Sequence, residues 1–115
     1  MKANRKLACP LVVAAESGRD KIVKALIAKN VSINQTNKWR QTALMVAVQR
    51  NHPRVVKALV EGGADTNIFD FEGMTALAMA VVRGFVDIAV YLMKEGKADT
   101  KTRTNQLIMK QGRKK

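Results

Sequence analysis

Histidine, cysteine and paired carboxylates are the side chains that could support catalysis or hold a metal ion. The sequence has one histidine, His52, and one cysteine, Cys9. A zinc site needs three or four ligands, and no second cysteine or carboxylate pair lies near His52 at ligand spacing. The sequence also lacks G-x-S-x-G, C-x-x-C and the glycine-rich loops that bind phosphate. We therefore expect no enzymatic activity, no metal and no cofactor, and interpret His52 as structural.

The composition predicts a small aliphatic core. The chain has 115 residues, of which 47% are hydrophobic but only 4% aromatic. The single cysteine excludes an intrachain disulfide and is typical of a reducing compartment. We interpret Cys9 as a small buried apolar residue.

The elements that position these residues recur along the chain. Residues 42–67 predict a short helix, a turn and a second helix that begins at Pro53, where the missing N–H of proline costs nothing. We expect Gly62 and Gly63 to end that helix with positive φ. A period of 33 residues links the following sets: Leu11, Leu44 and Leu77; Ala14, Ala47 and Ala80; Ile22, Val55 and Ile88; Leu26, Leu59 and Leu92.

This period, with Thr42-Ala43-Leu44 and Thr75-Ala76-Leu77 opening two copies and Gly63-Ala64-Asp65 closing one, resembles the ankyrin-repeat family. The resemblance implies an all-α solenoid of stacked helix-turn-helix units joined by β-hairpin-like finger loops. It places three repeats at about 5–37, 38–70 and 71–104. Residues 105–115 are then a basic tail or a truncated fourth repeat, and the chain is a three-repeat array or a piece of a longer one.

Each repeat predicts an inner and an outer helix. In repeat one, we expect Ile22, Val23, Leu26 and Ile27 to form the buried stripe of the outer helix, with a polar exterior that suits a terminal capping repeat. The outer helix of repeat three is apolar on nearly all sides, so something must cover it. The expected helices span residues 10–17, 20–29, 43–50, 53–61, 76–83 and 86–94.

The family resemblance implies a non-catalytic protein–protein interaction module or scaffold. Such proteins bind partners through their finger loops and the concave face of the inner helices. Carried onto this chain, the partner-binding positions are Lys38, Trp39, Gln41, Gln49 and Arg50 in repeat two, and Phe71, Glu72, Met74, Val82 and Arg83 in repeat three. In repeat one they include Arg5, Lys6, Glu16 and Ser17.

The aromatic residues of the loops have two interpretations each. Trp39 is the only tryptophan and belongs to a residue type enriched at binding hot spots, but it could equally fold onto the adjacent repeat. Phe71 and Met74 flank the turn at Gly73 and could bind a partner or pack between fingers. We expect Phe69 to point into the stack.

The charge is strongly positive and concentrated toward the ends. The net charge is +12; residues 1–38 hold eight basic and two acidic side chains, and residues 105–115 hold four basic and no acidic ones. Such a field attracts an acidic protein partner. Contact with nucleic acid or an anionic surface through the basic N- and C-terminal ends is the alternative, and such binding would weaken steeply with salt.

No membrane segment is predicted. No apolar run approaches the roughly 18 residues of a membrane span. Residues 1–15 have the basic and apolar regions of a secretory signal, but Pro10 interrupts the apolar run and Leu11 belongs to the repeat register. We therefore expect a cytoplasmic or nuclear protein. A monomer is expected, with self-association through the apolar outer helix of repeat three as the alternative.

Overall fold

A computed structural model describes residues 9–96, and this part of the chain contains six helices and no strand. The helices agree with the predicted ones to within a residue at each end. In chain order they are α2 (Pro10–Glu16), α3 (Asp20–Ala28), α4 (Ala43–Gln49), α5 (Pro53–Glu61), α6 (Ala76–Arg83) and α7 (Val86–Lys94).

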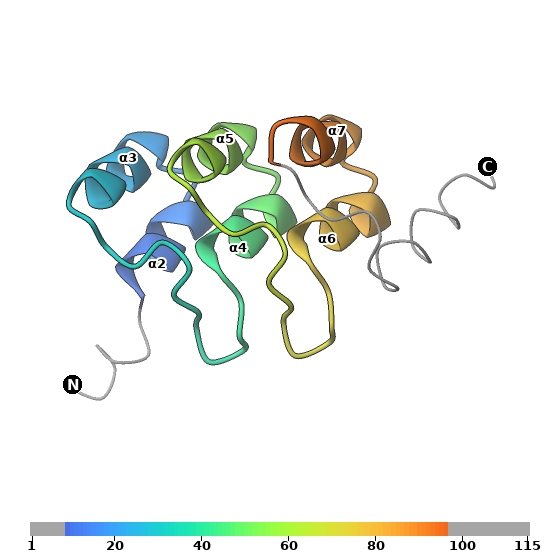
Figure 1. Ribbon diagram of the computed structural model, residues 1–115, viewed down its shortest axis with the longest axis horizontal. Coiled ribbons are helices and arrows are strands. Elements are labelled where there is room, and N and C mark those ends of the chain that lie inside the picture. The colour runs from blue at the N-terminus through green and yellow to red at the C-terminus, as the bar shows by residue number, and fades with distance from the viewer. Residues whose placement is uncertain (1–8, 97–115) are drawn as a thin grey trace.

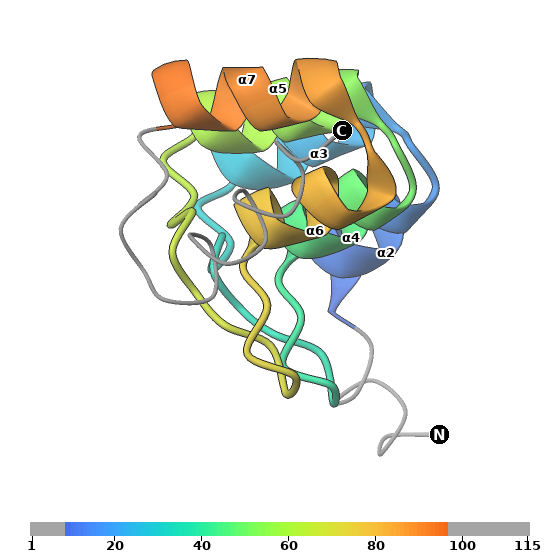
Figure 2. The ribbon, with the colours of Figure 1, turned by 90° about the vertical axis from the view of Figure 1, so that its right-hand side faces the viewer.

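The helices form two layers (Figure 1). Helices α2, α4 and α6 lie side by side in one layer, and α3, α5 and α7 lie above them in the same order. Helix α4 packs against α2 on one side and α6 on the other, while each outer helix is linked to the inner helix before it by a tight turn. The loops after α3 and α5 extend away from the helices and lie next to each other (Figure 2).

The core between the layers is aliphatic, as the composition predicted. The largest fully buried side chains are those of Leu11, Leu44, Met45, Leu59, Leu77 and Leu92, together with four valines and Thr42. Cys9 is also buried and free, so its interpretation as a small apolar residue is confirmed. Each of these short helices buries apolar residues against its neighbours, which is how stacked repeats gain the core that a single pair lacks.

Two threonines begin the inner helices of the second and third pairs. The hydroxyl of Thr42 accepts a hydrogen bond from the Met45 amide at 3.2 Å, and that of Thr75 accepts one from the Ala78 amide at 3.2 Å. Such caps satisfy an amide that the first helical turn leaves unpaired. Cys9 holds the equivalent position before α2 and makes no side-chain cap.

Two local expectations were wrong. Gly62 has an ordinary φ of −80°, and only Gly63, at +95°, is left-handed. The helix therefore continues its right-handed geometry through Gly62 and leaves it one residue later. Ile22 is 47% exposed, whereas Val23 next to it is fully buried, so Ile22 does not belong to the buried stripe of α3.

The loops are hairpin-shaped without being β-hairpins, because the described residues form no strand pairing. No helix among residues 9–96 is long and apolar enough to cross a membrane. Residues 105–115, predicted to be a basic tail or a truncated fourth repeat, lie outside the described residues, as do residues 1–8 of the basic N-terminal segment 1–38.

Candidate partner-binding site

Each projecting loop is closed by one side-chain oxygen. Asn37 Oδ1 accepts hydrogen bonds from the amides of Trp39 and Gln41, both at 3.0 Å. Asp70 Oδ1 accepts the equivalent pair from Glu72 at 2.8 Å and Met74 at 2.9 Å. The backbone bonds that close each turn are also equivalent, with Asn37 and Asp70 donating to the carbonyls of Gln41 and Met74 at 3.0 Å. Both loop tips are therefore held in one conformation by the same device.

Asn37 and Asp70 were not among the predicted site residues. They lie 33 residues apart, in the register of the repeat, and both are types whose side chains bond to the backbone two residues on. That spacing was the signal that could have identified them. They position the neighbouring side chains instead of offering their own.

The first loop tip presents an aromatic ring beside positive charge. Trp39 is 54% exposed, so it does not fold onto the adjacent repeat. The Lys38 ammonium lies 4.6 Å from the centre of the Trp39 ring, within the range of a cation–π interaction worth about 0.5–1 kcal/mol at an exposed site. Arg40 follows with φ +62°, where the second loop has Gly73 at +76°.

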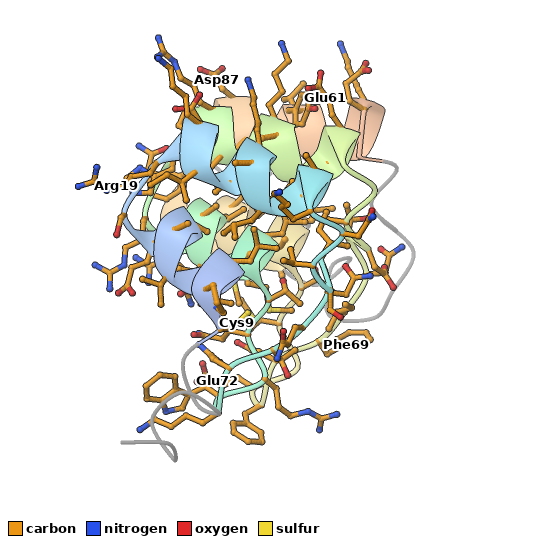
Figure 3. All side chains as sticks on the ribbon, turned by 90° about the vertical axis from the view of Figure 1, so that its left-hand side faces the viewer. Cys9, Arg19, Glu61, Phe69, Glu72 and Asp87 are labelled. Atoms are coloured by element: carbon orange, nitrogen blue, oxygen red, sulfur yellow. The ribbon has the colours of Figure 1, made fainter. Side chains whose placement is uncertain are left out.

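The second loop tip presents Phe71, which is 64% exposed, and the exposed carboxylate of Glu72 (Figure 3). Met74 is different, because it is half-buried and packs against the core. The prediction for Phe69 was wrong: its ring is 44% exposed and points away from the helices (Figure 3). The alternation of the loop backbone turns Ile68 toward the core and leaves Phe69 outside.

The inner-helix residues predicted for partner binding are partly engaged with one another. The Gln41 amide donates to Gln49 Oε1 at 3.5 Å, a long hydrogen bond, and its own oxygen accepts from Asn37 Nδ2 at 3.2 Å. Arg50 forms an ion pair with Glu16 at 2.6 Å, with both side chains about half exposed. Val82 and Arg83, at the end of α6, are exposed. Ser17 is also exposed, and Arg5 and Lys6 lie outside the described residues.

His52 joins two helix pairs. Its Nε2 lies 3.1 Å from the Glu16 carbonyl oxygen, which accepts a hydrogen bond from the Nε2–H tautomer. Its ring also covers Gly18, where an added Cβ would lie only 2.9 Å from the imidazole. The described residues contain no group of three or more histidine, cysteine or carboxylate side chains that could hold a metal ion. The hydrogen bond to Glu16 and the packing on Gly18 give His52 a structural role between the first two helix pairs.

Two hollows among residues 9–96 lie away from the loop tips. One, of about 190 Å³ and lined mainly by apolar side chains, is formed by residues of α5 and α7, among them Val56, Ile88 and Tyr91. Another, lined by charged residues of α3 and α5, holds Lys24, Arg54 and Glu61. Neither includes a loop-tip residue. The loop tips project away from the helices (Figure 2).

The fold and the repeated turn geometry agree with a comparison to protein families. Residues 10–104 match the family model for ankyrin repeats in three copies. The chain belongs to the ankyrin-repeat family. Ankyrin repeats are generally protein–protein interaction modules and are typically not catalytic. A search among curated proteins found no match to this chain.

Proposed function

We propose that this ankyrin-repeat chain is a non-catalytic interaction module that binds a partner protein through its two loop tips and the adjoining inner-helix face. The observation that supports this most is the pair of exposed aromatic rings, Trp39 and Phe71, on neighbouring loops that hydrogen bonds hold in place. Large exposed aromatics on ordered backbone bury much area at little entropic cost, which is typical of binding hot spots.

The charges around Trp39 favour an acidic partner. Lys38 and Arg40 flank Trp39, and Arg83 is exposed at the end of α6. Among the described residues, no carboxylate lies within ion-pair distance of these three side chains. The ion pair found there joins Arg50 to Glu16. A partner segment that places an apolar side chain on Trp39 and carboxylates beside it would satisfy both features.

The test is partner capture with single variants. Trp39→Ala and Phe71→Ala should each lose a protein that the native chain retains at moderate salt, with binding weakened about thirtyfold or more if either is a hot spot. Val90→Ala is the matched control, because Val90 is an exposed apolar residue on the outer layer. Retention of the partner by both loop variants would contradict the proposed site.

Tryptophan fluorescence offers a direct reading of the same site. Because Trp39 is the only tryptophan, its emission reports on the first loop tip alone. A purified partner that covers this tip should shift the emission to shorter wavelength, as its exposed ring loses water contact. Binding without any change in emission would place the interface away from Trp39.

Contact with nucleic acid or an anionic surface remains the second candidate, and the outer layer adds an observation in its favour. Lys21 and Lys24 on α3, and Arg54 and Lys57 on α5, are exposed at equivalent positions of two adjacent helices. Asp20 and Glu61 line the hollow between those helices and offset part of this charge. Capture that nuclease abolishes, that falls steeply with salt, and that survives Trp39→Ala would favour this candidate.

A further inference from the structure

The first helix pair exposes side chains that the other pairs bury. We define the N-terminal face as the following residues of α2 and α3: Pro10, Val13, Ile22, Ala25 and Leu26. Val13 is 49% and Ile22 47% exposed, Pro10 and Ala25 are exposed, and Leu26 is half-buried. All five are apolar. They lie beside the polar exterior that we expected of a capping repeat, because Lys21 and Lys24 are exposed as well.

The equivalent residues one repeat later are buried against a preceding helix pair. They are Ala43, Val46, Val55, Ala58 and Leu59, and all of them are buried. The inner helix α4 packs on α2, and the outer helix α5 packs on α3. These five positions therefore lie where the second helix pair meets the first. The N-terminal face therefore has the composition of a junction but has no preceding pair among the described residues.

Contacts at the first junction show which positions meet across it. Glu16 at the end of α2 pairs with Arg50 at the end of α4. The His52 ring covers Gly18, and the Ile27 side chain would lie 3.0 Å from a Cβ on Gly62. The forward-facing members of these pairs are Glu16, Gly18 and Ile27, and their equivalents two repeats further on are Val82, Gly84 and Met93. We call these three residues, with Val81, the C-terminal face.

The C-terminal face has room for a following pair. Gly84 has the same left-handed backbone as Gly18, but nothing lies within 4 Å of its Cβ position, whereas the His52 ring fills that space over Gly18. Val82 is 61% exposed. Val81 is half-buried, although its equivalents Ala15 and Val48 are fully buried. The two ends of the stack in Figure 1 are thus complementary halves of one kind of junction.

We propose that the N-terminal face binds the C-terminal face of a second copy of this chain, which continues the stack head to tail. Stacking in register would place Lys21 of one copy beside Asp87 of the other, and Lys29 beside Glu95. All four side chains are exposed and the charges are opposite. The equivalent internal neighbours Lys21 and Arg54 carry like charges, whereas Lys21 and Asp87 carry opposite charges across this junction. A head-to-tail contact of this kind uses two different surfaces and has no built-in stop.

The net charge of +12 sets the conditions for the test, because repulsion between whole copies opposes association at low salt. At moderate salt, the weight-average mass of the full chain in sedimentation should rise with concentration. Ile22→Lys should weaken this association about tenfold or more, since it places an unpaired charge in the junction. A full chain that stays monomeric at every concentration overturns the proposal.

Val90→Lys is the matched control, because it adds the same charge at a position where the first two pairs carry Lys24 and Lys57 on the solvent side. It should leave the association intact. Circular dichroism of both variants checks that they fold, which is expected because both replaced side chains are more than one-third exposed. Equal weakening by the two variants would show that added charge alone acts, and would overturn the assignment to the N-terminal face.

A designed ion pair tests the register. At the proposed junction, Ser17 of one copy takes the place of Arg50, and Val82 of the other copy takes the place of Glu16. Both side chains are exposed. A Ser17→Arg chain mixed with a Val82→Glu chain should associate more tightly than either chain alone, because the Glu16–Arg50 pair is recreated between copies. No gain on mixing contradicts the head-to-tail register. Trp39→Ala should not affect any of these measurements, which separates this proposal from the loop-tip function.

Discussion

Single oxygen atoms decide the shape of both projecting loops. Asn37 supplies an amide oxygen and Asp70 a carboxylate, yet each accepts two backbone N–H bonds with nearly the same lengths. Geometry matters more than charge here, because both side chains have the same length and present an oxygen to the same two amides. The exposed rings of Trp39 and Phe71 depend on these bonds for their positions.

The cap position before the first helix offers a test at the same scale. Cys9→Thr should raise the free energy of unfolding by about 1 kcal/mol, because Thr42 and Thr75 make a cap there that Cys9 does not. Urea unfolding measures the change. Cys9→Val, which has the shape of threonine without its hydroxyl, is the control. If valine stabilises as much as threonine, packing and not capping is responsible.

Tyr91 gives the stability a dependence on alkaline pH. Burial, and to a smaller extent the carboxylates of Glu61 and Glu95, raise the pKa of Tyr91 above its usual value of 10.0. Since the folded state favours the neutral phenol, this contribution to stability is fully present below the unfolded pKa. It is lost as the pH rises through the higher folded pKa.

We expect Tyr91→Phe to flatten the fall of stability with pH in this alkaline range. Denaturant unfolding at a series of pH values measures it. The phenolate absorbance of the native chain gives the folded pKa directly, because Tyr91 is the only tyrosine. A native pKa at or below that of free tyrosine would contradict the prediction.

Between elements, the first two helix pairs meet where a glycine lets the His52 ring approach the backbone. Gly18 has φ +72° and lies under the His52 ring, while Gly84 has φ +75° and open space above it. The two glycines therefore share one backbone requirement but differ in packing. Phe85 takes the place of His52 at the next junction and packs against the core.

Alanine at these two positions should separate the two effects. Gly84→Ala should cost about 1–2 kcal/mol, the penalty for a side chain in left-handed backbone. Gly18→Ala should cost about 1–3 kcal/mol more, because its Cβ collides with the imidazole. Thermal or urea unfolding compares them. Adding His52→Ala to Gly18→Ala should recover part of the difference, and equal costs for the two alanines would rule out the steric argument.

Across the described part of the molecule, the helices differ in how many neighbouring helix pairs cover them. Helix α4 has neighbours on both sides and buries every residue from Ala43 to Val48, whereas Val23 is the buried residue of α3. Stacked repeats gain stability from each neighbouring interface, so an element with one neighbour opens more readily than one with two.

Hydrogen exchange should reveal this gradient. We expect the amides of α4 to exchange most slowly and those of α3 to exchange first among the described helices. NMR or mass spectrometry measures the exchange rate of the amides in each helix. Measurement at two pH values verifies that exchange reports the opening equilibrium. Equal protection in α3 and α4 would mean that the described part of the chain opens as one unit.

Local patterns were enough to predict the six helices. The proline at the start of α5 and the threonines before α4 and α6 act through nearby backbone, and the 33-residue period shows where these signals recur. The loop residues for partner binding remain a prediction. Their exposure could not be read from type alone, as Phe69 shows, because a loop ring is buried or exposed according to how the turn directs it.

The sequence by itself determined where the helices begin and end and that they repeat, because caps, prolines and apolar spacing are local properties of the chain. Only the tertiary structure decided which equivalent residues are covered. Ile22, Val55 and Ile88 are similar β-branched side chains at one position of the repeat, yet Ile22 is exposed and the other two are buried. The reason is that burial depends on whether a neighbouring helix pair lies against that position, and no local pattern carries that information.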